Sequence, residues 1–122
     1  MESLAFVNTK FANRSADRPD IEFEFAGGSI ASDSGTTRAG LGITDRTFSM
    51  YAPLVGRESY SFTVFLTQPK SRGSVRLRSR DPFAKPIFEA GYFTHPDDVK
   101  VLVEGMKFGI AIINSKVYYT IC

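Results

Sequence analysis

The residues whose chemistry could support catalysis are few in this chain of 122 residues. His95 is its one histidine and Cys122 its one cysteine. A general base needs a partner and a pocket, and structural zinc needs about four nitrogen or sulfur ligands. The sequence therefore predicts no catalytic residue and no metal site. Because His95 precedes Pro96 at the start of an expected helix, we interpret it as a surface or capping residue.

Paired carboxylates and phosphate-binding glycines are not indicated either. Asp97 and Asp98 are adjacent, which fits the positive N-terminal end of a helix better than acid–base catalysis. Gly40 and Gly42 have the first spacing of the G-x-G-x-x-G dinucleotide motif, but Asp45 stands where its third glycine is needed. We therefore expect this chain to hold no dinucleotide cofactor of its own.

A run of cationic side chains occupies residues 68–88, QPKSRGSVRLRSRDPFAKPIF, with six lysines and arginines against one acid. On a strand, Arg76, Arg78 and Arg80 would share the outer face, while Val75 and Leu77 would face inward. A sheet that binds RNA interleaves exposed aromatic residues with basic ones, and this outer face has none. Since the net charge is only +2, a solvated strand face is favoured, and nucleic-acid binding is the least favoured alternative.

Composition bounds the remaining choices. A chain with 43% hydrophobic and 13% aromatic residues has enough apolar surface for one packed domain. No apolar run approaches the roughly 18 residues of a membrane span, and the first residues lack the pattern of a signal peptide. Strand-like sequence begins almost at once, so we expect the chain to be a piece of a larger protein.

The elements that must position any site follow from periodicity. Strands are predicted at 4–12, 21–26, 60–68 and 73–80, of which IEFEFA (21–26) alternates strictly. We expect the last two to pair as an antiparallel hairpin around a short turn. The stretch 27–42 is predicted as a long surface loop, because it is rich in glycine, serine and threonine and has no periodicity.

One long helix is predicted at the end of the chain. Thr94 as N-cap and Asp97 three residues later fit a capping box. Apolar residues then recur at helical spacing up to position 113: Leu102, Met106, Ile110 and Ile113. Strands followed by a helix predict an α+β fold, an antiparallel sheet with a long C-terminal helix.

The stretch from Pro69 onward resembles the C-terminal substrate-domain signature of the glucose-methanol-choline (GMC) flavoprotein oxidoreductases. The matching residues keep the order and spacing of that signature: Arg72, Gly73, Val75, Leu77, Ser79, Asp81, Pro82, Pro86, Tyr92, Phe93, Asp98, Leu102 and Gly105. The segment LAFVNTKFANRSADRPDIEFEF is similar to the one that precedes it in the insect glucose-dehydrogenase-like branch. The resemblance covers 2–115, and residues 116–122 form a tail that leaves the pattern, so 1–122 would be a partial substrate-binding domain.

The resemblance implies an FAD-dependent oxidoreductase that acts on CH–OH groups of alcohols or sugars. In that family a Rossmann-like portion holds FAD, and an antiparallel sheet with flanking helices covers the substrate cavity above it. The flavin-binding segment and the catalytic histidine of the family have no counterpart here, and His95 matches neither histidine position. The parent protein would therefore bind FAD, and this chain alone would be inactive. The alternative is a non-catalytic binding or interaction module of the same lineage.

Three residues receive roles through the resemblance. Phe65 corresponds to an aromatic residue that faces the substrate in sugar-oxidising members, and Tyr51 lies near a second aromatic wall position. Core packing is the alternative for each. The implied partners are a small alcohol or sugar and the missing FAD-binding domain, with no nucleic acid and no membrane. The parent would be secreted, which favours glycosylation of Asn13, since NRS at 13–15 fits the N-x-[ST] acceptor pattern.

Overall fold

The computed structural model describes residues 2–116. It divides into two compact units, one formed by Met1–Ala5 with Phe23–Thr63 and the other by Phe6–Glu22 with Val64–Cys122. The first is called here the helical-turn unit and the second the α3 unit. Each is described by itself below.

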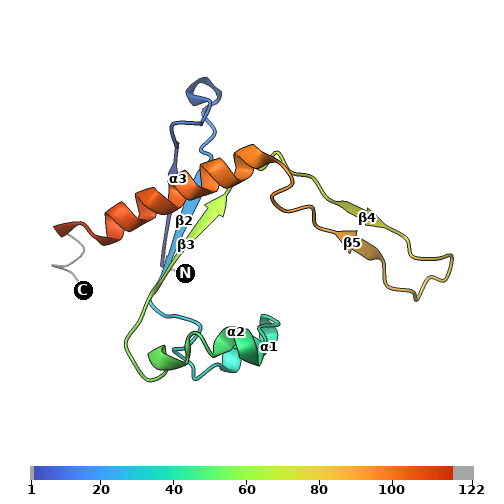
Figure 1. Ribbon diagram of the computed structural model, residues 1–122, viewed down its shortest axis with the longest axis horizontal. Coiled ribbons are helices and arrows are strands. Elements are labelled where there is room, and N and C mark those ends of the chain that lie inside the picture. The colour runs from blue at the N-terminus through green and yellow to red at the C-terminus, as the bar shows by residue number, and fades with distance from the viewer. Residues whose placement is uncertain (1, 117–122) are drawn as a thin grey trace. The chain divides into compact units, whose positions relative to one another are not determined.

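Within residues 2–116, ten helices and strands follow one another, and Figure 1 shows their arrangement within the chain. The strands are β1 (Ser3–Val7), β2 (Ile21–Ala26), β3 (Ser61–Leu66), β4 (Ser74–Arg76) and β5 (Ile87–Glu89). The α-helices are α1 (Thr36–Gly40), α2 (Asp45–Phe48) and α3 (Pro96–Ile113), and the 3-10 helices are η1 (Arg14–Ala16) and η2 (Ala52–Leu54). One sheet has the order β1-β2-β3, and β4 pairs with β5 in a second. The expected α+β class, antiparallel sheets with a C-terminal helix, is confirmed.

The alternation of IEFEFA is visible in β2. Ile21 is 0% and Phe23 is 2% exposed, whereas Glu22 and Glu24 are only partly buried. In the helical-turn unit, the rings of Phe23 and Phe62 lie 5.0 Å apart between centroids, a tilted contact between two neighbouring strands of the sheet. Aromatic pairs at this distance add to the stabilisation that burial provides.

The stretch 27–42 is more ordered than the sequence suggested, and the prediction of a simple loop was wrong there. Asp33 accepts hydrogen bonds from the backbone N–H of Gly35 (2.9 Å) and of Thr37 (2.6 Å), and from the Thr37 hydroxyl. These bonds, above all the one from the Thr37 hydroxyl, lower the pKa of the Asp33 carboxyl. A carboxylate that binds the first amides of a helix stabilises its start, so α1 forms without any apolar periodicity.

The predicted hairpin between 60–68 and 73–80 was wrong. β3 belongs to the three-stranded sheet, and β4 pairs with β5 in the antiparallel register Ser74–Glu89, Val75–Phe88 and Arg76–Ile87. The turn after Pro69 is tied to α3 instead of reversing the chain, as described below. The hairpin turn lies instead between β4 and β5. These two strands, the turn that joins them and the residues beside them (72–93) are called here the β4–β5 ribbon.

Val75 and Leu77 do not face inward as expected. They are 67% and 83% exposed. The reason is that β4 and β5 form a sheet of only two strands, and no other described element packs against the face that carries these side chains. The strand also ends at Arg76, so Arg78 and Arg80 lie in the turn that follows.

Helix α3 begins one residue later than the capping box predicted. His95 is the N-cap, and its Nδ1 accepts a hydrogen bond from the Asp97 amide at 3.2 Å. Thr94 instead donates its hydroxyl to the Gly91 carbonyl at 3.0 Å. Thr94 as N-cap was therefore wrong, whereas the capping interpretation of His95 is confirmed. Pro96 occupies the first turn, where its missing N–H costs nothing.

The buried face of α3 is made by glycine as much as by large apolar residues. Asp98, Gly105 and Gly109 are buried, while Met106 and Ile110 of the expected apolar stripe are half exposed. A Cβ placed on Gly105 would lie 2.7 Å from Ile21 Cδ1. The helix backbone therefore rests directly on Ile21, which is fully buried. Among the described residues, no helix combines the length and the apolar character needed to cross a bilayer.

Candidate functional site

Phe65 lines an apolar cavity of about 310 Å³ in the α3 unit. The cavity lies between the end of β3, the residues after β5 and the first turns of α3, and its wall includes Tyr92, Phe93 and Leu102. Phe62, Val64 and Leu66 are partly buried and Phe65 is 44% exposed, as the alternation of the strand predicted. A volume of this size suits a small ligand.

Two polar residues, Ser71 and Asp98, also line this cavity. Asp98 is 3% exposed, and its carboxylate accepts hydrogen bonds from the backbone N–H groups of Lys70 and Ser71, each at 2.8 Å. Ser71 in turn accepts the His95 amide on its Oγ at 3.0 Å. These bonds tie the turn after β3 to the first turn of α3, and so fix the wall of the cavity.

Asp97 is the centre of an exposed ion-pair cluster at the same helix end. It lies 2.7 Å from Lys70 Nζ and 3.1 Å from Lys100 Nζ. These contacts, the one with Lys70 first, lower the pKa of the Asp97 carboxyl to about 2. Surface pairs of this kind contribute little to stability, so the buried Asp98, rather than Asp97, is the structural anchor.

Replacing Asp98 by asparagine is expected to loosen this anchor and to flatten the acid dependence of unfolding. Hydrogen bonds from Ser71 and Lys70 hold the pKa of the Asp98 carboxyl below its ordinary value of 3.8. A lowered folded-state pKa means that the stabilisation is complete above that ordinary value and is lost as the pH falls through the folded-state pKa. We expect the Asp98→Asn variant to be less stable at neutral pH and to lose less on acidification, measured by urea unfolding followed by circular dichroism. Glu58→Gln, at an exposed acid of the helical-turn unit, is the control, and equal acid slopes in Asp98→Asn and the parent would contradict the assignment.

Tyr51 lies in a different unit from Phe65. It precedes η2, is 38% exposed, and its carbonyl oxygen accepts the Leu54 amide at 2.9 Å. The structure does not gather the two predicted substrate-facing aromatic residues within one unit. A shared role for them stays a prediction.

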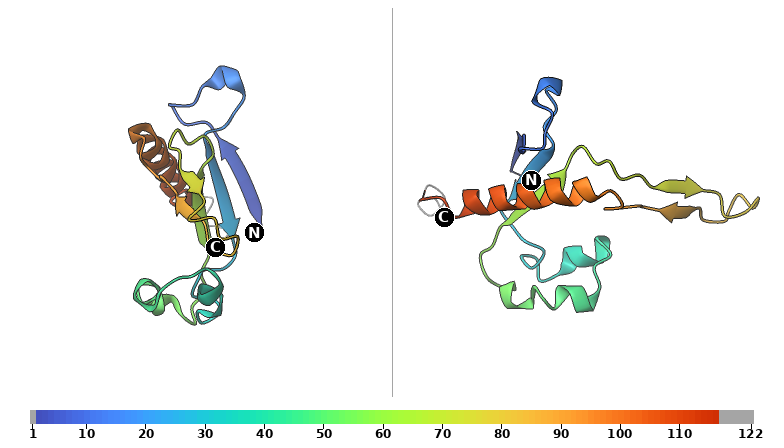
Figure 2. Two further views of the ribbon diagram at one scale, coloured as in Figure 1. Left: turned by 90° about the vertical axis from the view of Figure 1, so that its right-hand side faces the viewer. Right: turned by 45° about the horizontal axis from the view of Figure 1, so that its top comes forward.

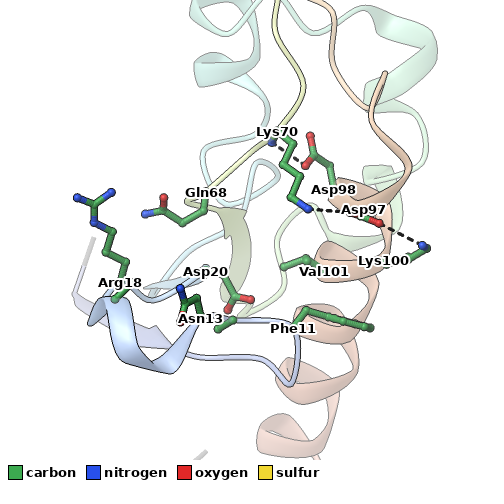
Figure 3. Close-up of a pocket in the computed structure, with 12 residues that line it drawn as sticks. Phe11, Asn13, Arg18, Asp20, Gln68, Lys70, Asp97, Asp98, Lys100 and Val101 are labelled. Carbon is green, nitrogen blue, oxygen red and sulfur yellow. Dashed lines mark hydrogen bonds and ion pairs between the residues drawn. The ribbon is translucent and has the colours of Figure 1, made fainter.

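Asn13 lies in the loop between β1 and β2, and is exposed. The base of this loop is closed by Asp20, whose two carboxylate oxygens accept the Thr9 amide (2.8 Å) and the Thr9 hydroxyl (2.6 Å). Asn13 and Phe11 line a second cavity, of about 660 Å³, whose other wall comes from the first turns of α3 and the residues after β3 (Figure 3). The loop with η1 extends beyond the ends of β1 and β2 (Figure 2).

The glycines of the chain do not form a cradle for the diphosphate of FAD. Such a cradle needs a strand, a tight glycine turn and a helix whose N-terminus faces the phosphates. Gly27 and Gly28 do follow β2, but the next helix, α1, starts only at Thr36 and has five residues. Among the described residues, therefore, no arrangement fits this cofactor.

Three arginines of the cationic run are engaged in or beside the β4–β5 ribbon. Arg76 pairs with Glu89 at 3.1 Å, Arg78 donates to the Lys85 carbonyl at 3.1 Å, and Arg72 donates to the Ser71 carbonyl at 2.8 Å. Side chains held in this way orient and cap the ribbon's own backbone. They give no independent support to a nucleic-acid surface.

Sequence reasoning missed the structural importance of Asp98 and Asp20. Both lie in polar sequence, and Asp98 was interpreted as a residue of the helix N-terminus and of the family signature, with no structural role assigned to it. The structural role of each carboxylate depends on two backbone or hydroxyl donors that lie 11 to 28 residues away in the sequence. Local sequence patterns give no information about partners at such separations. Tyr92 and Phe93 were part of the family signature, but nothing in their spacing placed them beside Phe65.

Comparison with known proteins identifies the lineage. Residues 69–120 match the profile of the family described as GMC oxidoreductase. Glucose dehydrogenase (FAD, quinone) of Drosophila melanogaster is 40% identical over 114 residues, which cover 89% of this chain and 16% of that protein. Choline oxidase of Arthrobacter globiformis is 38% identical over 93 residues, which cover 75% of this chain and 14% of the oxidase. Alcohol dehydrogenase (acceptor) of Pseudomonas putida is 34% identical over 58 residues, which cover 46% of this chain.

The chain thus spans only 16% of the length of the glucose dehydrogenases it matches. The family match runs to residue 120, and the boundary expected at 115 stays a prediction. Residues 117–122 of the expected tail lie outside the described residues. The chain is homologous to Drosophila glucose dehydrogenase, and its residues 69–120 match the C-terminal domain family of the GMC oxidoreductases.

Proposed function

We propose that this chain is part of the substrate-binding portion of an FAD-dependent oxidoreductase that acts on the CH–OH group of a sugar or another small alcohol. The observation that carries the proposal is the apolar cavity that Phe65 lines together with Tyr92 and Phe93 of the family signature. The similar proteins support this substrate class, because their names include glucose, choline and alcohol.

The part played by the chain's own residues is to bind and orient. Aromatic rings offer a flat apolar surface to the C–H face of a sugar, and they exclude water from the reacting carbon. Asp98 and Ser71 fix the wall by holding the turn after β3 to α3. FAD, when bound by the parent protein, supplies the hydride acceptor. Since the described residues offer it no site, we assign its binding to the rest of the parent, which we propose to be a secreted protein of the glucose-dehydrogenase-like branch.

The test compares this chain with the longer protein obtained by extending its reading frame in both directions. We expect the longer protein to purify with a visible flavin spectrum, which an alcohol or sugar from a panel that includes glucose bleaches under anaerobic conditions. The present chain, mixed with FAD and passed through gel filtration, is expected to retain none. FAD that stays with the chain would contradict our assignment of the cofactor. A flavin that no sugar or alcohol reduces would favour the alternative of a non-catalytic binding module.

A further inference from the structure

The loop 8–20 carries an acceptor pattern that no other part of the chain repeats. Asparagine occurs at positions 8, 13 and 114, and only Asn13 has a serine or threonine two residues later, Ser15. An aromatic residue, Phe11, stands two residues before it. The run Phe-x-Asn-x-Ser therefore brings an aromatic ring, an acceptor amide and the required hydroxyl into five residues.

The local geometry presents this amide for modification. Asn13 Oδ1 accepts hydrogen bonds from the Ser15 amide (3.2 Å) and from the Ser15 hydroxyl (2.7 Å). The hydroxyl that the acceptor pattern requires thus already contacts the side chain that would carry the sugar. Asn13 and Ser15 are both exposed, and Thr9 with Asp20 closes the loop below them.

The neighbouring cavity has the size and lining of a sugar site. Its volume is about 660 Å³, and Phe11, Asn13 and Val101 are among its wall residues. Most of the remaining wall consists of hydrogen-bonding side chains, of which Lys70 and Lys100 also pair with Asp97: Arg18, Asp20, Gln68, Lys70, Asp97, Asp98 and Lys100. Figure 3 shows Phe11 and Val101 on the α3 side and Arg18 on the side of η1, with Asn13 between them. A pyranose has one apolar C–H face and a rim of hydroxyl groups, which such a combination matches.

The ring of Phe11 keeps surface available for a ligand. It is 50% exposed. Lys10 Nζ lies 5.2 Å from its centroid and also pairs with Glu104 at 3.1 Å. The Lys10 ammonium group therefore covers one part of the Phe11 ring, and its ion pair with Glu104 links Phe11 to α3. The rest of the ring borders the cavity.

We propose that Asn13 is N-glycosylated and that the first sugar of its glycan packs against Phe11 in this cavity. The reaction forms a bond between Asn13 Nδ2 and the anomeric carbon of a lipid-linked diphosphate oligosaccharide. The bond from that carbon to the diphosphate breaks, the lipid diphosphate leaves, and Nδ2 loses one proton. The inference rests on the secreted parent of the proposed function, but the acceptor can be tested without it.

The first experiment translates the chain, fused to a signal sequence, in the presence of microsomal membranes. We expect one band of reduced mobility that endoglycosidase removes. Asn13→Gln and Ser15→Ala should abolish it, while Ser15→Thr and the matched control Asn8→Gln should retain it. A chain that keeps a single mobility, or a shifted band that persists in Asn13→Gln, overturns the proposed site whatever the parent oxidises.

The second experiment tests where the sugar lies. The glycosylated chain is treated with peptide N-glycosidase under native conditions, and the release rate is compared with that after denaturation. Contact with Phe11 should slow native release, and Phe11→Ala should raise that rate by about tenfold, the factor that corresponds to about 1.4 kcal/mol of lost contact. Phe6→Ala, at an exposed aromatic residue of β1, should leave it unchanged. Equal native release from Phe11→Ala and the parent chain overturns the packing of the sugar on Phe11.

Discussion

In the flavin enzyme that we propose as the parent of this chain, replacing Phe65 by alanine is expected to lower kcat/KM for the proposed sugar or alcohol substrate by about 10- to 100-fold. The change removes the aromatic wall of the cavity beside Tyr92 and Phe93. Loss of a large apolar contact costs about 1.5 to 3 kcal/mol, and each 1.4 kcal/mol corresponds to roughly a factor of ten. Steady-state kinetics with the best substrate of the panel measures the effect, and most of it should appear in KM, because the ring binds the substrate before and during the reaction.

Thr63→Ala provides the matched control for Phe65→Ala. Thr63 lies two residues earlier on the same exposed face of β3, but it does not line the cavity. We expect its kinetic constants to equal those of the parent enzyme. If Phe65→Ala also left kcat/KM unchanged while the flavin content stayed normal, Phe65 would be a surface residue and the cavity would not be the substrate site.

Replacing Gly73 by alanine is expected to disrupt the base of the β4–β5 ribbon and to destabilise the protein by about 1 to 3 kcal/mol or more. A Cβ at this position would overlap the backbone of the opposite strand, with only 2.8 Å to the Ala90 carbonyl carbon. Gly91 stands across from it with a φ of +62° and is equally close to the backbone of Arg72. Backbone atoms cannot rotate away as a flexible side chain can, so the strands must separate. The urea midpoint, followed by circular dichroism, measures the loss.

Gly40→Ala separates this clash from the general effect of replacing glycine. Gly40 is the last residue of α1, and a Cβ there meets nothing within 4 Å. Alanine is favoured over glycine in a helix by about 1 kcal/mol, so this variant should be as stable as the parent or slightly more. Equal midpoints for Gly73→Ala and Gly40→Ala would show that the ribbon tolerates a side chain at its base.

The ribbon also connects fold to function. Its return strand leads directly into Tyr92 and Phe93, which line the cavity with Phe65. A shift at Gly73 is therefore expected to reach the wall of this cavity, whereas Gly40 belongs to the other unit. Phe65 is thus a wall residue of this cavity, and Gly73 fixes the position of the strand that leads to its neighbours Tyr92 and Phe93.

Local pattern alone determined several features of this protein. The alternation in IEFEFA placed Ile21 and Phe23 in the interior, because side chains of a strand point alternately to its two faces. The alternation in β3 separated Phe65 from its partly buried neighbours for the same reason. The long helix α3 followed from the residues at its first turn and from helical spacing, although its N-cap is His95 and not Thr94. The ordered residues of the family signature identified the GMC lineage, which the match over 69–120 supports.

Only the tertiary structure decided which strands pair and which residues meet. β3 and β4 are consecutive, yet β4 pairs with β5, because the Asp98 carboxylate accepts the amides of Lys70 and Ser71 and ties the chain after β3 to the first turn of α3. Gly105 contacts Ile21 although 84 positions separate them in the numbering. Such contacts depend on where distant segments come together in space, and the periodicity of a single segment carries no information on its partner. The cavity around Phe65, like the one beside Asn13, exists only because of those partners.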